Sequence, residues 1–267
     1  MSDLEYTVKD HIATILLNRP EKLNTFTDEM IRTWRESVQE AQNDDNVRVV
    51  VLTGAGRAFC AGGDMSKRAA EAQGAVPMKL TPIERKEHMR AGAQSVALAL
   101  QALEKPIIAA VNGAAVGAGM DMALMCDIRL AAKSARFSEA YLRVGLVPGA
   151  GGCYFLPRVV GLSKALELFF TGDFVDGPEA ERIGLVSHCY DDDKLMEEAY
   201  RLAAKIVNAP PIAVRMIKRT IYQSLDTDLR TSLDLVSSHM PIVQLTEDSK
   251  EAIAAFKEKR PGRFSGR

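Results

Sequence analysis

The sequence predicts an α/β fold in which a core of mixed strands and helices is followed by a purely helical region. Two short apolar runs, at residues 47–52 and 107–111, each lead into a glycine-rich turn. A β-branched run that glycines interrupt is typical of a buried strand that ends in a tight turn. Segments with helical spacing separate these runs, and from Lys194 onward every pattern is helical. This order favours a mixed sheet with a C-terminal helical appendage.

The elements of the first half follow from local patterns. Residues 5–19 first alternate and then run apolar, which predicts a hairpin or a pair of edge strands. Thr27 or Asp28 can cap a helix, because apolar residues follow at helical spacing. Residues 65–81 are polar and small without a clear period, which predicts a loop. A long helix is expected over 83–103, where a nearby proline stops it.

The second half continues with shorter elements and then with long helices. Strands are expected over 107–111 and 128–131, with a helix between them that follows Gly119. A further glycine-rich turn lies at 147–152. The remaining expected elements are helices over 163–170 and 178–183, a strand over 186–190, and helices over 195–207, 212–225 and 248–259. No strand is expected after residue 190.

Composition and charge limit the classes of function. The chain has 267 residues, 47% of them hydrophobic and 26% charged, which suits one large domain or a domain with a small appendage. The net charge is −1 without a long run of one sign, which argues against nucleic acid or an anionic membrane surface as the main partner. The N-terminus lacks an apolar signal core and an arginine-rich transit pattern, and no apolar stretch is long enough to span a bilayer. We therefore expect a cytoplasmic protein.

The four cysteines and four histidines are scattered along the chain, and no C-x-x-C pair occurs. Dispersed thiols in a chain without a signal segment are typical of reduced core residues. The spacing of a zinc site is absent, so no metal is expected. No pattern favours a catalytic cysteine–histidine pair.

The two glycine-rich turns, at 61–64 and 117–121, predict a functional site. Glycine and alanine keep the backbone bare, so a ligand can approach main-chain N–H groups closely. Two such turns brought together could aim two donors at one oxygen, as an oxyanion hole does. Either turn alone is better explained as a strand-to-helix turn packed on the sheet. Because each turn carries an aspartate, Asp64 or Asp121, the pair favours function.

Three other motifs are excluded. Gly54-Ala55-Gly56 follows a strand, but Phe59 stands where the dinucleotide fingerprint needs its third glycine. A Walker phosphate loop and a G-x-S-x-G nucleophile elbow do not occur in the sequence.

Four motifs carry a family resemblance. They are AFCAGGD at 58–64, KPIIAAVNG at 105–113, MCDI at 125–128 and GLVPGAGG at 145–152. Together they resemble the crotonase family, also called the enoyl-CoA hydratase/isomerase superfamily, over residues 18–260.

The resemblance implies a spiral of β-β-α units over residues 1–195, which carries the acyl-CoA site, and a helical trimerisation region over 196–267. It also implies acyl-CoA thioester substrates, a stabilised thioester enolate, and no cofactor beyond the coenzyme A moiety of the substrate. The expected assembly is a homotrimer or a hexamer of two trimers.

The resemblance also assigns binding groups. It places the oxyanion donors on the backbone N–H groups of Gly63 and Ala118, the second at a helix start where N–H groups are unpaired. Lys259, with Phe256, would help to hold coenzyme A, although Lys259 is equally well explained as a solvated charge in a basic tail. The segment that would cradle coenzyme A comprises Ala61, Gly62, Gly63, Asp64, Met65 and Ser66.

The acid/base positions depart from the family pattern. A typical hydratase of the family has two glutamates, and their positions are occupied here by Asp121 and Tyr141. A third carboxylate of some isomerases falls on Gly149 and is absent. Asp121 lies among apolar helix residues, where an unpartnered carboxylate is costly, so a role in the pocket is favoured over helix stabilisation, and a raised pKa is expected. Glu139 would face elsewhere if the local backbone is regular.

Hydration of a 2-enoyl-CoA, or its reverse, is the leading expectation, with Asp121 as the main acid/base group. Tyr141 could donate a proton, orient a water or shape the acyl pocket. Double-bond isomerisation is the first alternative, because it needs one shuttling base, and thioester hydrolysis is a weaker one. A non-catalytic acyl-CoA-binding or RNA-binding relative is the alternative from another class, but the near-neutral charge argues against RNA.

Overall fold

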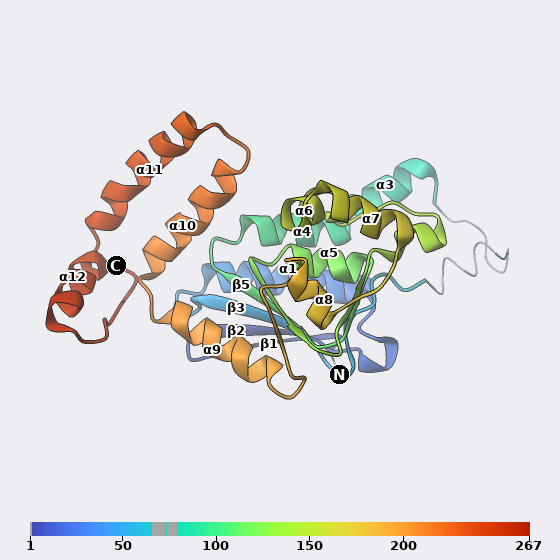
Figure 1. Ribbon diagram of the computed structural model, residues 1–267, viewed down its shortest axis with the longest axis horizontal. Coiled ribbons are helices and arrows are strands. Elements are labelled where there is room, and N and C mark those ends of the chain that lie inside the picture. The colour runs from blue at the N-terminus through green and yellow to red at the C-terminus, as the bar shows by residue number, and fades with distance from the viewer. Residues whose placement is uncertain (1, 66–72, 74–79) are drawn as a thin grey trace.

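A computed structural model of the chain, which describes residues 2–65, 73 and 80–267, shows two sheets surrounded by helices (Figure 1). The larger sheet has the strand order β1-β2-β3-β5-β7-β10, and the smaller has the order β4-β6-β8-β9. The strands of the larger sheet are β1 Leu4–Lys9, β2 Ile12–Leu17, β3 Val49–Gly54, β5 Ile107–Val111, β7 Ile128–Ala132 and β10 His188–Tyr190. Those of the smaller are β4 Ala58–Cys60, β6 Ala114–Val116, β8 Arg136–Ser138 and β9 Val175–Asp176. The expected α/β fold is confirmed.

The two sheets arise from a repeated strand pair. In β3/β4, β5/β6 and β7/β8 the first strand joins the larger sheet and the second joins the smaller, so the chain winds as a spiral. The corners between the paired strands are tight: a Cβ on Gly113 would lie 2.2 Å from the Arg57 carbonyl oxygen. The sequence did not predict the strands of the smaller sheet, because two or three residues are too few to show a period.

Helices connect and cover the strands. They are α1 Asp28–Asn43, α3 Pro82–Ala91, α4 Ala93–Ala102, α5 Ala118–Leu124, α6 Gly152–Val160, α7 Leu162–Thr171, α8 Gly177–Arg182, α9 Leu195–Val207, α10 Pro211–Ser224, α11 Leu229–Gln244 and α12 Glu247–Glu258, with 3-10 turns η1 Pro20–Lys22 and η2 Ala140–Val144. Thr27 caps α1, since its side chain accepts a hydrogen bond from the Met30 N–H at 3.0 Å. The single helix expected over 83–103 is wrong: the chain breaks at Gly92, between α3 and α4.

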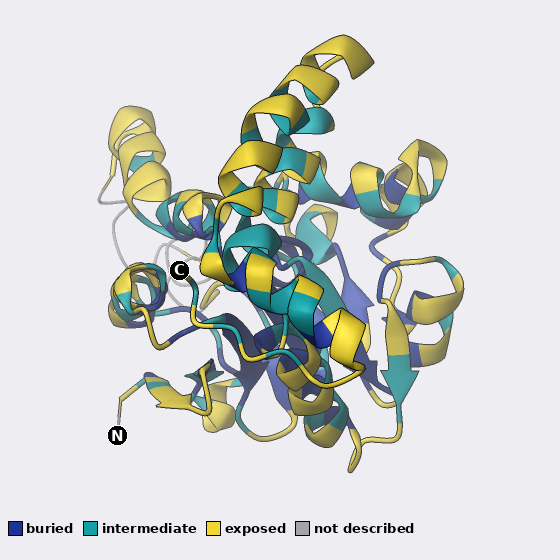
Figure 2. Ribbon diagram, turned by 90° about the vertical axis from the view of Figure 1, so that its left-hand side faces the viewer, coloured by how far each residue is buried: buried dark blue, intermediate teal, exposed yellow. Residues whose placement is uncertain are grey.

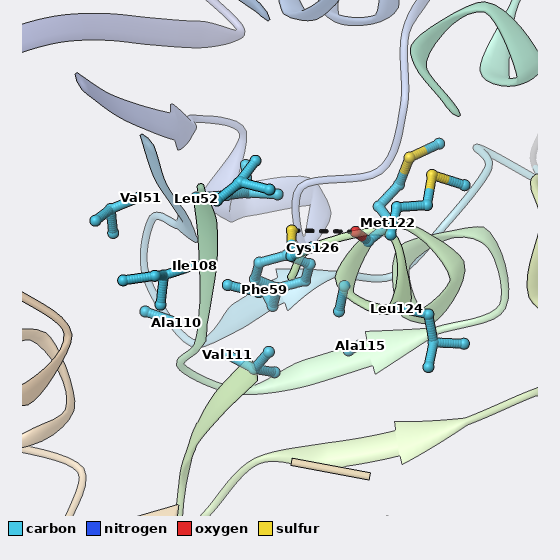
Figure 3. Packing of buried hydrophobic residues seen from close by; sticks show 14 of the residues in the cluster. Val51, Leu52, Phe59, Ile108, Ala110, Val111, Ala115, Met122, Leu124 and Cys126 are labelled. Carbon is cyan, nitrogen blue, oxygen red and sulfur yellow. Dashed lines mark hydrogen bonds between the residues drawn. The ribbon is translucent and has the colours of Figure 1, made fainter. Parts of the chain in front are cut away.

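The core lies between the sheets and beneath α9. Every residue of β3 is buried, because both faces of the larger sheet are covered. Figure 3 shows Phe59 of β4 among side chains of the larger sheet such as Ile108 and Val111, and all three are fully buried. Helix α9 packs on β3, β5 and β7 and buries Ala199 and Ala203. The boundary expected after residue 195 thus falls at the start of a helix that packs with the core.

The helices that leave the core are α10, α11 and α12. With the tail that follows, they form residues 211–267, which we call the C-terminal arm. The arm projects from one end of the molecule (Figure 1), and Figure 2 shows it mostly exposed or half-buried above the buried strands. Neither α10 nor α11 has a buried residue. The arm therefore presents apolar surface that the described core does not cover.

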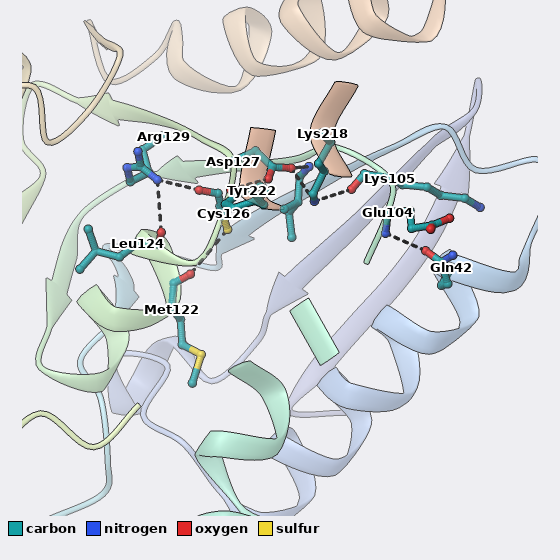
Figure 4. A network of polar contacts seen from close by, with 11 residues as sticks. Gln42, Glu104, Lys105, Met122, Leu124, Cys126, Asp127, Arg129, Lys218 and Tyr222 are labelled. Atoms are coloured by element: carbon teal, nitrogen blue, oxygen red, sulfur yellow. Dashed lines mark hydrogen bonds and ion pairs between the residues drawn. The ribbon is translucent and has the colours of Figure 1, made fainter. Parts of the chain in front are cut away.

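A polar network attaches α10 to the core (Figure 4). Asp127 precedes β7, and its Oδ2 accepts hydrogen bonds from the Lys218 Nζ and the Ile107 N–H, both at 2.8 Å. Its Oδ1 accepts one from the Tyr222 hydroxyl at 2.8 Å. Lys218 also donates to the carbonyl of Lys105 at 2.9 Å. Two side chains of α10 are thus held on the ends of two core strands.

Candidate active site

The structure brings the two glycine-rich turns together. Strands β4 and β6 pair in parallel, so the turns that follow them emerge at the same edge of the smaller sheet. A Cβ on Gly62 would lie 2.8 Å from the Val116 carbonyl oxygen and 3.4 Å from the Ala118 nitrogen. Gly62 also has a φ of +85°, a left-handed conformation that favours glycine. The backbone of the first turn therefore packs directly against the start of α5.

The two expected donors lie on either side of this contact. Gly63 is exposed, and a Cβ added to it would find nothing within 4 Å. Ala118 is half-buried and is the first residue of α5. Within the described part of the chain, neither N–H group donates a hydrogen bond to a backbone carbonyl. Neither N–H group is thus committed to the backbone, which is a condition that an oxyanion hole requires.

Asp121 lies on α5, fully buried. Its Oδ2 accepts hydrogen bonds from the Tyr141 hydroxyl at 2.6 Å and from the Ala150 N–H at 3.2 Å. Burial raises the pKa of Asp121 to about 6, because the loss of solvent outweighs these hydrogen bonds, which lower the pKa. The carboxyl group is therefore suited to proton transfer near neutral pH. Because its partners come from other segments, helix stabilisation alone does not explain it.

Tyr141 lies on η2, between Asp121 and the donor turn. The side chain is half-buried, and its ring atoms lie 3.8 Å from where a Cβ on Gly117 would stand. Burial and the charge of Asp121 both raise the pKa of Tyr141, so the hydroxyl keeps its proton. That proton is directed at Asp121. Of the two hydrogen-bonded side chains, Tyr141 is the more exposed, because Asp121 is fully buried.

Glu139 does not face elsewhere, because the backbone around it is not regular. Glu139 is fully buried, and it meets Asp121 beside Gly152. A Cβ on Gly152 would lie 2.2 Å from Asp121 Oδ1 and 3.2 Å from Glu139 Oε1. Strand β8 ends at Ser138 and η2 begins one residue after Glu139, so Glu139 adopts φ −84° and ψ 55° and the alternation of a strand does not apply.

The surroundings of Glu139 keep it uncharged. Loss of solvent, and after it the charge of Asp121, raise the pKa of Glu139 to about 10. The one sequence feature that could have indicated a place for Glu139 in the site is its position directly after a buried strand and close to a glycine-rich turn.

The segment expected to cradle coenzyme A is described only in part. Gly62 is buried and Ala61 half-buried, while Asp64 and Met65 are exposed beside Gly63. Ser66 lies outside the described residues. This stretch continues directly from the first donor turn.

Lys259 and Phe256 are not brought to the donor turns within one chain. Phe256 is on α12 and Lys259 ends that helix, on the C-terminal arm. Figure 1 places α12 at the far end of the C-terminal arm, away from α5, which the second donor turn opens. The distance to which α10–α12 project depends on tertiary contacts that no local pattern reveals, so this separation was not predicted.

Other site chemistries find little support in the described residues. In the part of the chain that the structure describes, no three histidine, cysteine or acidic side chains gather in a way that could hold a metal ion. Cys60 and Cys126 are buried, and burial raises the pKa of both thiols to about 12.

No described helix combines the length and the hydrophobicity that a membrane span needs.

Comparison with known proteins adds to this geometry. The sequence profile described as Enoyl-CoA hydratase/isomerase matches residues 7–267. The chain is 38% identical over 250 residues to a short-chain-enoyl-CoA hydratase of Clostridium acetobutylicum, covering 93% of this chain and 92% of that protein. It is 36% identical over 260 residues to the 1,2-epoxyphenylacetyl-CoA isomerase of Escherichia coli, with 97% of each covered. A crystal structure of an enoyl-CoA hydratase from Bacillus anthracis superposes with a TM-score of 0.92 at 33% identity, covering 99% of this chain and 100% of that one.

Proposed function

Since the chain belongs to the enoyl-CoA hydratase/isomerase family, we propose that it adds water to the double bond of a 2-enoyl-CoA thioester or removes it in the reverse reaction. The observation that carries this proposal is the buried Asp121 carboxyl group, held by Tyr141 beside two backbone N–H groups that have no backbone partner in the described chain. Such a site joins a proton-transfer group to an anion-stabilising pair.

The N–H groups of Gly63 and Ala118 would bind the thioester carbonyl oxygen. Negative charge grows on this oxygen as the enolate forms, and donors already in place stabilise that charge more than the neutral carbonyl. Coenzyme A would then extend along residues 61–65, on the exposed side of the first turn.

The proton route runs through Tyr141, because Asp121 is fully buried and Tyr141 is only half-buried. In hydration, the Tyr141 oxygen accepts a proton from water while its own proton passes to Asp121 Oδ2. The water oxygen bonds to the β-carbon, and the thioester becomes an enolate. The proton then returns by the same route to the α-carbon, so that H and OH have been added and Asp121 is ionised again.

Double-bond isomerisation is the second candidate. A single proton route is enough for it, since the same group removes a proton from one carbon and returns it to another. Gly149 stands where some isomerases of the family have a further carboxylate, so Asp121 would work alone. One similar protein is itself named as an isomerase.

A panel of 2-enoyl and 3-enoyl thioesters separates these functions, because hydration adds the mass of one water and isomerisation leaves the mass unchanged. Asp121→Asn should keep thioester binding and lose about 10²–10⁴-fold in kcat. Tyr141→Phe should lose turnover as well, whereas direct transfer by Asp121 would leave it nearly active. Full activity of Asp121→Asn would sink both functions and leave a thioester-binding protein.

The proposed assembly is a homotrimer, or a hexamer of two trimers, formed through the C-terminal arm. The exposed apolar residues of α10 support it. Lys259 would then serve coenzyme A only if the arm of one subunit reaches the site of another, because its own α12 lies away from the donor turns.

A further inference from the structure

We propose that Glu139 is a positioning residue that acts through Asp121, as an uncharged acid whose proton is donated to the Asp121 carboxylate. This inference rests on the proposed role of Asp121 as the proton-transfer group. It assigns a function to a side chain that lies outside both family positions of the acid/base pair, which are Asp121 and Tyr141.

Three buried oxygen atoms carry the argument. Asp121 Oδ1 and both carboxyl oxygens of Glu139 are buried and make no well-formed hydrogen bond with the described residues, although the backbone of Gly152 lies close enough to Asp121 to lower its pKa. Two of them, Asp121 Oδ1 and Glu139 Oε1, lie within 3.2 Å of the same point, the Cβ position of Gly152. Two ionised carboxylates placed there would repel each other and leave buried acceptors unpaired. One proton shared between the groups removes the repulsion and pairs two of the three oxygens.

The partners of each group decide which one holds that proton. Asp121 Oδ2 has two donors, the Tyr141 hydroxyl and the Ala150 N–H, and they stabilise a charge on Asp121. Glu139 has no donor in the described chain, so its charge would be unsupported. The proton therefore resides on Glu139, and the negative charge resides on Asp121.

Among the described residues, no cationic side chain acts on Asp121 or Glu139 to stabilise a negative charge there. The ionisable group that acts on the pair from a neighbouring element is Tyr141 on η2, and it keeps its proton because its pKa is raised. The exposed Cys153 thiol on α6 only responds to the pair, whose charge raises its pKa. Glu139 thus supplies a third donor to a carboxylate that burial would otherwise protonate. Its loss should raise the pKa of Asp121 and leave less of this carboxyl group ionised near neutral pH, without removing any atom that touches the substrate.

Two substitutions at one position test this role. Glu139→Gln keeps a donor toward Asp121 but cannot ionise, and Glu139→Ala removes the donor. Near neutral pH, Glu139→Gln should keep kcat/KM within about fivefold of the unmodified enzyme, and Glu139→Ala should lose about 10–100-fold, the usual effect of losing a hydrogen bond to a charged group.

The pH profile gives the readout that a merely structural role would not change. In the unmodified enzyme, kcat/KM should fall below about pH 6, as Asp121 is protonated, and fall again toward about pH 10, as Glu139 loses its proton. Glu139→Gln should keep the acidic limb and lack the alkaline limb. If Glu139→Gln is as impaired as Glu139→Ala at every pH, Glu139 transfers a proton itself and the proposal is overturned. Three identical profiles would overturn it as well.

An infrared difference spectrum between the unmodified protein and Glu139→Gln needs no substrate. It should contain the carbonyl band of a protonated carboxyl group at neutral pH. A missing band overturns the proposal even if the thioester panel shows turnover. A band without turnover supports the shared proton and counts only against the proposed function. Circular dichroism checks that both variants fold.

Discussion

At Gly152, helix α6 begins directly against the Asp121 carboxyl group. A Cβ there would lie 2.2 Å from Asp121 Oδ1, so Gly152→Ala must displace this carboxyl group. We expect a loss of kcat of about 10-fold or more, because small misplacements of a catalytic group are costly. Alanine is the better helix former, so α6 itself should persist.

The matched control is Cys153→Ala, at the next, exposed position of the same helix. It should keep kcat close to that of the unmodified enzyme. Steady-state rates and circular dichroism on both variants check this prediction. Gly152→Ala with undiminished kcat would show that the position of the Asp121 carboxyl group does not limit the reaction.

Individual site residues differed in how far the sequence could predict them. The apolar neighbours of Asp121 indicated a buried carboxyl group, and the structure places it so. The position of Glu139 beside Asp121 was not predicted, because its orientation depends on one residue between a strand and a 3-10 turn. Lys259 could not be placed, because the direction of the C-terminal arm follows from tertiary contacts such as that between Lys218 and Asp127.

For the secondary-structure elements, the attachment of α10 through Asp127 is the most testable feature. Asp127→Ala would leave the Lys218 ammonium, whose side chain is 12% exposed, without its carboxylate. We expect the free energy of unfolding to fall by about 3 kcal/mol, as for other largely buried pairs that lose one partner. Urea unfolding measures the change.

A second aspartate provides the control for this measurement. Asp226 pairs with Arg158 where both side chains are far more exposed, 55% and 40%. Asp226→Ala should therefore cost less than about 1 kcal/mol. Equal losses for the two variants would mean that the Asp127 network does not fix α10.

Helices and strands were predictable where a segment was long enough to show its hydrophobic period. The strand expected at 107–111 and the helix expected at 195–207 have those bounds in the structure. Helix α6 was not expected, because glycine-rich residues precede it and Pro157 lies inside it. The break at Gly92 was equally hidden, since apolar spacing continues across it.

For the whole molecule, the exposed face of α10 predicts assembly. Ile217, Ile221 and Leu225 follow one another at helical spacing, and each is more than half exposed. We expect an apolar row of this kind to lie in a protein–protein contact, and the family resemblance makes a trimer or a hexamer of two trimers the expected closed assembly. Light scattering at micromolar concentration should report one of these masses, and a monomer would contradict the prediction.

Changing the α10 face should dissociate the assembly. The double variant Ile217→Asp with Ile221→Asp introduces charge into the proposed contact and should yield smaller particles. Ile83→Asp is the control, because Ile83 is also exposed but lies on α3, outside the C-terminal arm. Dissociation by Ile83→Asp alone would place the contact elsewhere.

The repeated strand pair divides the chemistry among its units. Gly63 follows the first pair, Ala118 and Asp121 the second, and Glu139 and Tyr141 the third. The groups that would bind the thioester oxygen thus come from the first two units, and those that tune the proton come from the last. Replacement of residues in the third unit alone could change which carbon receives a proton and leave thioester binding intact. In such a scaffold, the proton route can change in one unit while the oxyanion donors of the other two stay in place.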